Sequence, residues 1–332
     1  MPPFPGSRAS RAPRAPRGAT QQPPSTHLRL LCIIGAAFAV TPAAAAALAG
    51  LPPIERLLLS DRLGGIRTSV RRRFGEELRP RLLGAAEAGG SIPNFTVIFP
   101  GAGGRDGLSN ELDGALAEEA AAAAGAGPPP LVTTFDWGEH RGTLLTAAFD
   151  AEGVGEAVGG ALAGLWAAEE GGAAVALPPA SVHCVGISVG AFAAHGMAAE
   201  LGRLLAGAAE GGGGPPPHVR LTLLDPFTSR GVLGAGYGAA NFGRGADYAV
   251  QYMNTDDPVP STNEPLPLCV CYDVTGAAAR SAFALPEGES MHCWPVAYLA
   301  RHLRGRPGGS GSGTVRHGDG TGLERGTVVK VE

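Results

Sequence analysis

Short apolar runs alternate with longer Ala-rich stretches along the chain after residue 90. The short runs are rich in β-branched and aromatic residues and predict strands at 95–99, 131–135, 181–185, 219–224 and 248–253. The longer stretches predict helices at 108–124, 143–168, 189–209 and 296–303. This alternation predicts an α/β fold, with a mostly parallel central sheet and helices on both faces. In such sheets the chemistry lies beyond the carboxyl ends of the strands, so the residues that follow each strand are the candidates.

A G-x-S-x-G sequence follows the third predicted strand and precedes a helix. It comprises Gly186-Ile187-Ser188-Val189-Gly190. At a strand-to-helix turn this pattern is typical of a nucleophilic serine on a strained backbone, where larger flanking side chains would strike the neighbouring strand or helix. Ser188 is therefore the candidate nucleophile, with Gly186 and Gly190 as the small residues of the turn. The alternative is an ordinary Gly-rich turn with a helix-capping serine, which a chain with 52 glycines can contain by chance.

The first predicted strand is followed by Pro100-Gly101-Ala102-Gly103-Gly104. Small residues leave backbone N–H groups free to point into a site, as an oxyanion hole requires. We expect Gly101, Ala102 and the N–H of Val189, which follows the nucleophile, to form it. A phosphate cradle would need a nearby lysine, and the one lysine is Lys330. Because G-x-G-x-x-G is also absent here, we predict no nucleotide cofactor.

Acids and a histidine follow the later strands. Asp225 comes after the fourth strand, Asp256 and Asp257 come after the fifth, and His292 lies in a late loop before the last helix. A carboxylate at either place can orient a histidine and stabilise its imidazolium, which would complete the order Ser, Asp, His. The simpler interpretation of each aspartate is a turn-capping role.

Several segments together resemble the lipase/vitellogenin branch of the α/β-hydrolases, the pancreatic-lipase-like family. The resemblance runs from about residue 95 to 303 and rests on FPGAGG, FDWGEH, VHCVGISVGAFAAHGMA, VRLTLLDPFTSRG and MHCWPVAYL. It implies an α/β-hydrolase fold, and it implies Asp225 as the acid because the family's acid follows the strand after the nucleophile helix. Asp257 is the alternative acid, as in most other α/β-hydrolases, and Asp256 beside it is a further alternative.

The chain departs from this family at several points. Ile187 and Pro100 stand where the family usually has histidine. The stretch between Asp257 and His292 leaves no room for a long lid closed by a disulfide, and nothing resembles the family's C-terminal β-sandwich. The resemblance therefore implies the reaction class more firmly than the substrate.

Composition and charge exclude several classes. There is no G-X-Y repeat, which excludes collagen, and 17% charged residues are too few for a charge-driven disordered chain. The net charge is −4, whereas a nucleic-acid binder is normally basic, so we expect no nucleic-acid partner. Residues 1–54 hold five arginines and no acid, which leaves 21 basic against 30 acidic residues in the rest, a balance of −9.

The acid-free segment 1–51 indicates a targeting leader or signal anchor. Its uncharged part, 30–51, contains an apolar stretch of the size of a signal-peptide core, followed by small residues that suit cleavage. We expect entry into the secretory pathway, with the protein secreted or anchored in a membrane. Import into a plastid or another organelle is the alternative, and an ordinary buried helix is the simplest one.

Residues 52–90 form a basic linker or helix before the domain at 91–305. Leucines mix here with eight arginines, so the segment either lies on an anionic membrane or packs its apolar face on the domain. We favour packing, because Gly64-Gly65 interrupts the basic amphipathic pattern. The Gly/Ser/Arg-rich tail, 306–332, is expected to be disordered.

Cys269, Cys271 and Cys293 flank the candidate histidine loop. In an oxidising compartment, a disulfide from Cys293 to Cys269 or Cys271 would fix that loop. Zinc bound by these cysteines and His292 is a rival, but C-x-C is not the usual ligand spacing, so we predict no metal site.

Two functions fit these residues. The first is a serine ester hydrolase that cleaves acyl esters, in particular those of lipids, through Ser188, His292 and an aspartate. The second is a non-catalytic binding protein on the same fold, because a fold does not imply an activity. The residues that follow the strands favour the first.

Overall fold

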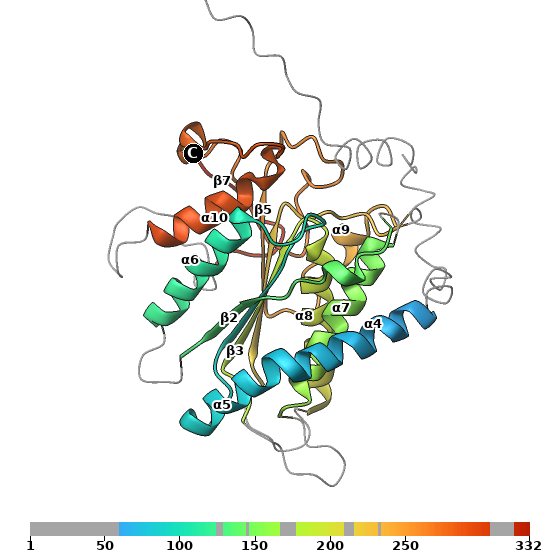
Figure 1. Ribbon diagram of the computed structural model, residues 1–332. Helices are drawn as coiled ribbons and strands as arrows, with labels where there is room; N and C mark the ends of the chain where they lie inside the picture. Colours follow the sequence, from blue (N-terminus) through green and yellow to red (C-terminus); the bar gives the residue numbers. More distant parts are fainter. Residues whose placement is uncertain are drawn as a thin grey trace, which may run out of the picture.

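The chain builds one seven-stranded sheet in which every strand is parallel to its neighbours (Figure 1). The computed structural model describes residues 60–123, 129–143, 146–166, 177–208, 216–231, 234–305 and 322–332. The strands are β1 Phe95–Phe99, β2 Leu131–Thr134, β3 Ser181–Ile187, β4 His218–Leu224, β5 Tyr248–Met253, β6 Val270–Asp273 and β7 Val328–Lys330. Their order across the sheet is β2-β1-β3-β4-β5-β6-β7. The predicted α/β fold with a parallel sheet is confirmed.

Helices cover both faces of this sheet. They are α4 Ser60–Arg73, α5 Arg79–Gly89, α6 Gly107–Ala123, α7 Ala147–Ala163, α8 Gly190–Ala208, α9 Tyr237–Asn241 and α10 Trp294–Arg304, with a π-helical segment Phe74–Leu78 between α4 and α5. Short 3-10 helices lie at Gly138–His140, Ala278–Ala282 and Met291–Cys293. Figure 1 shows α4, α7 and α8 on one side of the sheet and α6 and α10 on the other. The molecule therefore has three layers.

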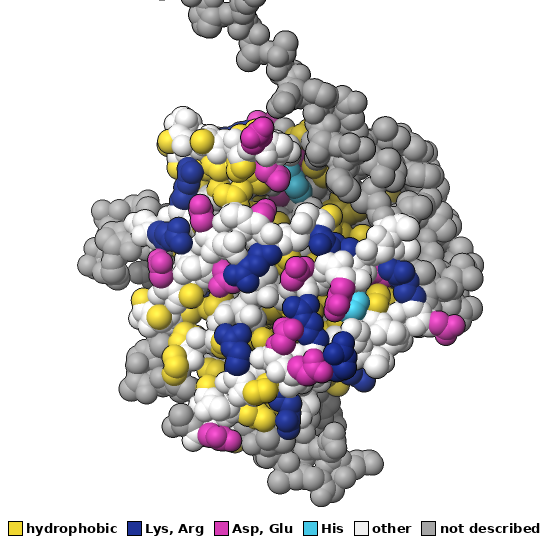
Figure 2. Space-filling model, in the orientation of Figure 1, with side chains coloured by type: hydrophobic (Ala, Val, Ile, Leu, Met, Phe, Trp, Pro, Cys, Tyr) yellow, Lys and Arg dark blue, Asp and Glu magenta, His cyan; other side chains and the backbone are white. Residues whose placement is uncertain are grey.

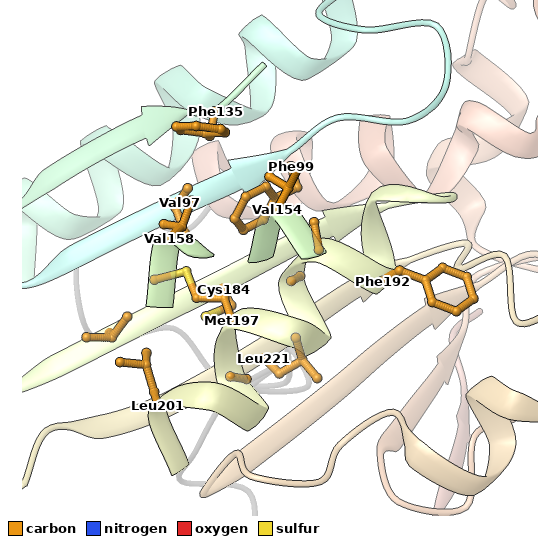
Figure 3. Packing of buried hydrophobic residues seen from close by; sticks show 14 of the residues in the cluster. Val97, Phe99, Phe135, Val154, Val158, Cys184, Phe192, Met197, Leu201 and Leu221 are labelled. Carbon is orange, nitrogen blue, oxygen red and sulfur yellow. The ribbon is translucent and has the colours of Figure 1, made fainter. Parts of the chain in front are cut away.

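Each face of the sheet carries its own apolar core. Alternate residues of one strand point to opposite faces, so Val97 and Phe99 join the core beneath α7 and α8, while Ile98 joins the core beneath α6 and α10. Figure 3 shows the first core, where side chains of the sheet interdigitate with those of α7 and α8. These two helices lie very close together: a Cβ on Gly155 would be 1.9 Å from the carbonyl oxygen of Ala193. Glycine is the residue that this contact requires.

The basic N-terminal helix belongs to the first core. Leu63, Ile66 and Val70 of α4 are buried there, and α4 packs on α7. Four of the five arginines of α4 pair with acids, as Arg62 does with Asp150 at 2.7 Å. Figure 2 shows basic and acidic side chains intermingled on this face of the molecule. The segment therefore packs on the domain as expected, and its helix runs without a break through Gly64-Gly65.

Two strands differ from the expectation. β6 is short and was not predicted, and β7 lies in the tail that we expected to be disordered. β7 pairs with β6 through Cys271↔Val328, Tyr272↔Val329 and Asp273↔Lys330. The disorder expected for 306–332 is therefore wrong for the last strand, because two adjacent valines extend a sheet edge that would otherwise lie open. Residues 306–321 lie outside the described part.

The predicted leader also lies outside the described residues, as does the apolar segment 30–51. Among the helices that the structure does describe, none is long and apolar enough to cross a membrane.

Candidate functional site

Ser188 occupies a left-handed turn between β3 and α8. Its φ angle is 53°, a conformation that L residues other than Asn and Asp adopt rarely and that clusters at functional sites. A Cβ on Gly186 would lie 2.6 Å from the Cα of Ala191, and one on Gly190 would lie 2.3 Å from the carbonyl oxygen of Phe99. Larger residues on either side of Ser188 would therefore clash with the neighbouring backbone, as expected.

The loop after β1 lies directly beside this serine. A Cβ on Gly101 would be 3.3 Å from the Cβ of Ser188. The indole of Trp137 fixes the loop by donating from Nε1 to the carbonyl oxygen of Pro100 at 2.8 Å. Among the described residues, the N–H groups of Ala102 and Val189 donate to no other group. Both donors are thus free for a negatively charged oxygen.

His292 meets two carboxylates through a single ring nitrogen. Its Nδ1 lies 2.6 Å from Oδ2 of Asp257 and 3.2 Å from Oδ2 of Asp225. The histidine side chain is 19% exposed, whereas the two aspartate side chains are 0% and 1% exposed. The structure therefore brings both predicted acids to the predicted histidine, and the nearer one is Asp257.

Asp225 is held at the end of β4 with a φ angle of 43°. Its N–H donates to the carbonyl oxygen of Tyr252, and its Oδ1 accepts from the N–H of Asn254 at 3.0 Å. Burial raises the pKa of this carboxyl to about 7, and the charge of Asp257 adds to the rise against the opposing hydrogen bond and charge of His292. Asp225 therefore sits where its charged form is costly.

Asp257 accepts more hydrogen bonds than Asp225 does. Its Oδ1 accepts from the N–H of Val259 at 3.0 Å, and its Oδ2 accepts from Oγ1 of Thr262 at 2.7 Å. Burial opposes ionisation, but the hydrogen bonds and charge of His292, with Thr262 and Val259, lower the pKa of Asp257 below its ordinary value. This carboxyl is therefore the ionised partner of His292 at neutral pH.

The two aspartates also raise the pKa of the histidine. Burial alone would lower the pKa of His292, but hydrogen bonds to Asp225 and Asp257 and their charges raise it to about 10. Nδ1 faces the carboxylates, which leaves Nε2 for another partner. Among the described residues no hydrogen bond joins Ser188 to His292, so that contact belongs to the proposal below.

Asp256 and the cysteines lie apart from this group. Asp256 is exposed and pairs with Arg280 at 2.7 Å, so it is not the alternative acid. Cys269, Cys271 and Cys293 are free thiols, and the expected disulfide is not formed. The reason is geometric: Cys269 and Cys271 point into the core beneath α7 and α8, while Cys293 precedes α10 on the opposite face of the sheet.

Two supporting residues were not predicted. Asn254 links the acid to the histidine loop, because its N–H binds Asp225 and its Nδ2 donates to the carbonyl oxygen of Met291 at 3.1 Å. It directly follows β5, so the search of residues after strands could have found it. Thr262 carries no such signal, since its contact with Asp257 depends on the path of a loop.

The same three side chains could also hold a cation. One atom each from Asp225, Asp257 and His292 lie within 4.8 Å of one another, the one such group among the described residues. Two carboxylates and an imidazole suit Zn²⁺ or Fe²⁺ in kind. The 2.6 Å between Nδ1 and Oδ2 is slightly shorter than the ~2.7–2.9 Å of a charge-assisted N–H···O bond, so a proton lies between these two atoms.

Comparison with protein-family models, curated proteins and solved structures gives no match. The likeness to lipases therefore rests on the residues of this chain alone.

Proposed function

We propose that this protein is a serine ester hydrolase of the α/β-hydrolase type. The observation that supports this most is the pairing of His292 with two buried carboxylates, at the same end of the sheet as a serine in a left-handed turn. A serine and a carboxylate that follow different strands, with a histidine just before α10, are the parts of a triad in which a general base activates the nucleophile.

In the proposed reaction Ser188 Oγ attacks the ester carbonyl, and Nε2 of His292 takes the hydroxyl proton. The N–H groups of Ala102 and Val189 stabilise the oxyanion of the tetrahedral intermediate. The proton then passes from His292 to the leaving alcohol, which leaves an acyl group on Ser188. Water activated by His292 hydrolyses this acyl-enzyme and restores the serine.

The substrate class rests on the resemblance to lipases, which implies acyl esters, including those of lipids. His292 follows Asp257 by 35 positions, and the stretch between them holds β6 and a 3-10 helix, so little chain remains there for a lid. We therefore expect activity on dissolved short-chain esters as well as on aggregated ones. Association with a membrane, and export or organelle import, would depend on the N-terminal segment and stay proposals.

A panel of p-nitrophenyl esters of short and long acyl chains tests this function. We expect hydrolysis by the intact chain and a loss of about 10⁴–10⁶ in kcat for Ser188→Ala. Ser281→Ala is the matched control, because Ser281 is exposed and lies outside the site. A folded protein without activity on any ester would favour the alternative, a binding protein on the same fold. Equal activity of Ser188→Ala and wild type would exclude the mechanism.

A further inference from the structure

A serine hydrolase needs one acid beside its histidine, and this site has two. Both act on the same nitrogen of His292 and come from different loops. Leu224 of β4 pairs with Tyr252 of β5, so the residues that follow these two neighbouring strands meet at one point. The arrangement thus depends on the register of these strands and on the path of the loop that carries Asp257.

We propose that Asp257 orients the histidine ring, and that Asp225 is a second positioning residue whose charge sets the pH at which His292 becomes a free base. This inference rests on the proposed function and deepens it. Asp257 has the shorter contact, 2.6 Å against 3.2 Å, and three donors in all. Asp225 has a weaker contact with His292 and one backbone donor, the N–H of Asn254.

The direction of the effect follows from the charges. Each carboxylate favours the imidazolium form, so two of them hold the proton on His292 to higher pH than one would. The pKa of about 10 for His292 reflects both. A protonated histidine cannot take a proton from Ser188, so activity should rise with pH above neutrality. Removing one charge should move that rise toward lower pH.

Few other titratable groups lie where they could set the pKa of His292. Asp225 comes from the end of β4, and Asp257 comes from the loop after β5. On the histidine's own loop, burial raises the pKa of the Cys293 thiol to about 12, so that thiol stays neutral. The charges of Glu289, Asp106 and Asp225 add to the rise in the pKa of Cys293. Those that raise the pKa of His292 come from Asp225 and Asp257.

The experiment is the pH dependence of kcat/KM on a dissolved ester for wild type, Asp225→Asn and Asp257→Asn. Asp256→Asn is the matched control, because Asp256 is exposed and pairs with Arg280. We expect Asp225→Asn to keep kcat within about tenfold and to shift the rising limb down by about one to three pH units. Asp257→Asn should lose about 10³–10⁴ in kcat at every pH. The control should match wild type.

Other outcomes overturn the inference. If Asp225→Asn loses about 10⁴ while Asp257→Asn stays active, Asp225 is the single acid, as the resemblance to lipases implies. An active Asp225→Asn variant in which kcat/KM rises at the same pH as in wild type also contradicts the inference. If that variant does not fold, an NMR titration of the His292 ring in wild type decides. A titration midpoint at or below pH 7 contradicts the proposal that both carboxylates raise the pKa of His292. Labelling of wild-type Ser188 by a fluorophosphonate shows separately whether the proposed function stands.

Discussion

Gly190→Ala tests whether the serine turn and the loop after β1 are packed as closely as the structure has them. The added Cβ would lie 2.3 Å from the carbonyl oxygen of Phe99 and 2.6 Å from that of Pro100. Normal contacts are roughly 3.2 Å or longer, so about 1 Å of backbone movement is needed. Both obstacles are backbone atoms, which cannot rotate away as a side chain would.

The expected cost comes in two parts. Overpacking of this size costs about 1–3 kcal/mol, against which alanine regains up to about 1 kcal/mol of helix propensity. We therefore expect a net loss of about 1–2 kcal/mol, which lowers Tm by roughly 2–8 °C in a domain of this size. Separation of Ser188 from the loop after β1 by about 1 Å should also lower kcat/KM about 10²-fold.

The assay combines thermal unfolding by circular dichroism with ester hydrolysis. Gly107→Ala is the matched control: Gly107 is the first residue of α6, as Gly190 is of α8, and a Cβ there would meet nothing within 4 Å. That variant should keep its activity and be as stable as wild type or slightly more stable. If Gly190→Ala behaves in the same way, the steric reasoning about the turn is wrong.

Two further predictions concern stability and metals. Glu152 is buried, accepts from Oη of Tyr237 at 2.5 Å and pairs with the buried Arg230 at 3.2 Å, so Glu152→Gln should lower the free energy of unfolding by about 3–5 kcal/mol in urea titrations. Glu76→Gln, which breaks an exposed pair with Arg72, should cost less than about 1 kcal/mol, and equal costs would refute the argument. A proton lies between Nδ1 of His292 and the carboxylates in the proposed site, so EDTA should leave kcat/KM unchanged. Loss of activity with EDTA that a divalent cation restores would instead make these residues metal ligands.

Local patterns predicted the four central strands β1, β3, β4 and β5 and the half-buried edge strand β2. The run 95–99 is apolar at nearly every position because helices cover both of its sides. β7 could not be predicted, since three residues in a Gly-rich tail become a strand only by pairing with β6. β6 itself was not predicted, because its Cys271 was assigned to a possible disulfide instead of to a strand. Its alternation in fact sends Cys271 to one core and Tyr272 to the other.

The candidate site was predicted in its parts but not in its arrangement. Ser188, Asp225, Asp257 and His292 were all found because each follows a strand or opens a helix, which is a local property. That both acids meet one nitrogen depends on the register of β4 against β5 and on the path of two loops. Those are long-range properties, so the sequence left a choice between acids where the structure has both.

The central claim is that Ser188 is an activated nucleophile, and covalent labelling tests it most directly. The intact chain is treated with a fluorophosphonate, and the site of the phosphonyl adduct is mapped by peptide mass spectrometry. The proposal predicts one adduct on Ser188, formed far more slowly in Asp257→Asn and absent in Ser188→Ala. A folded wild-type protein that stays unlabelled, or is labelled equally at Ser281, would contradict it.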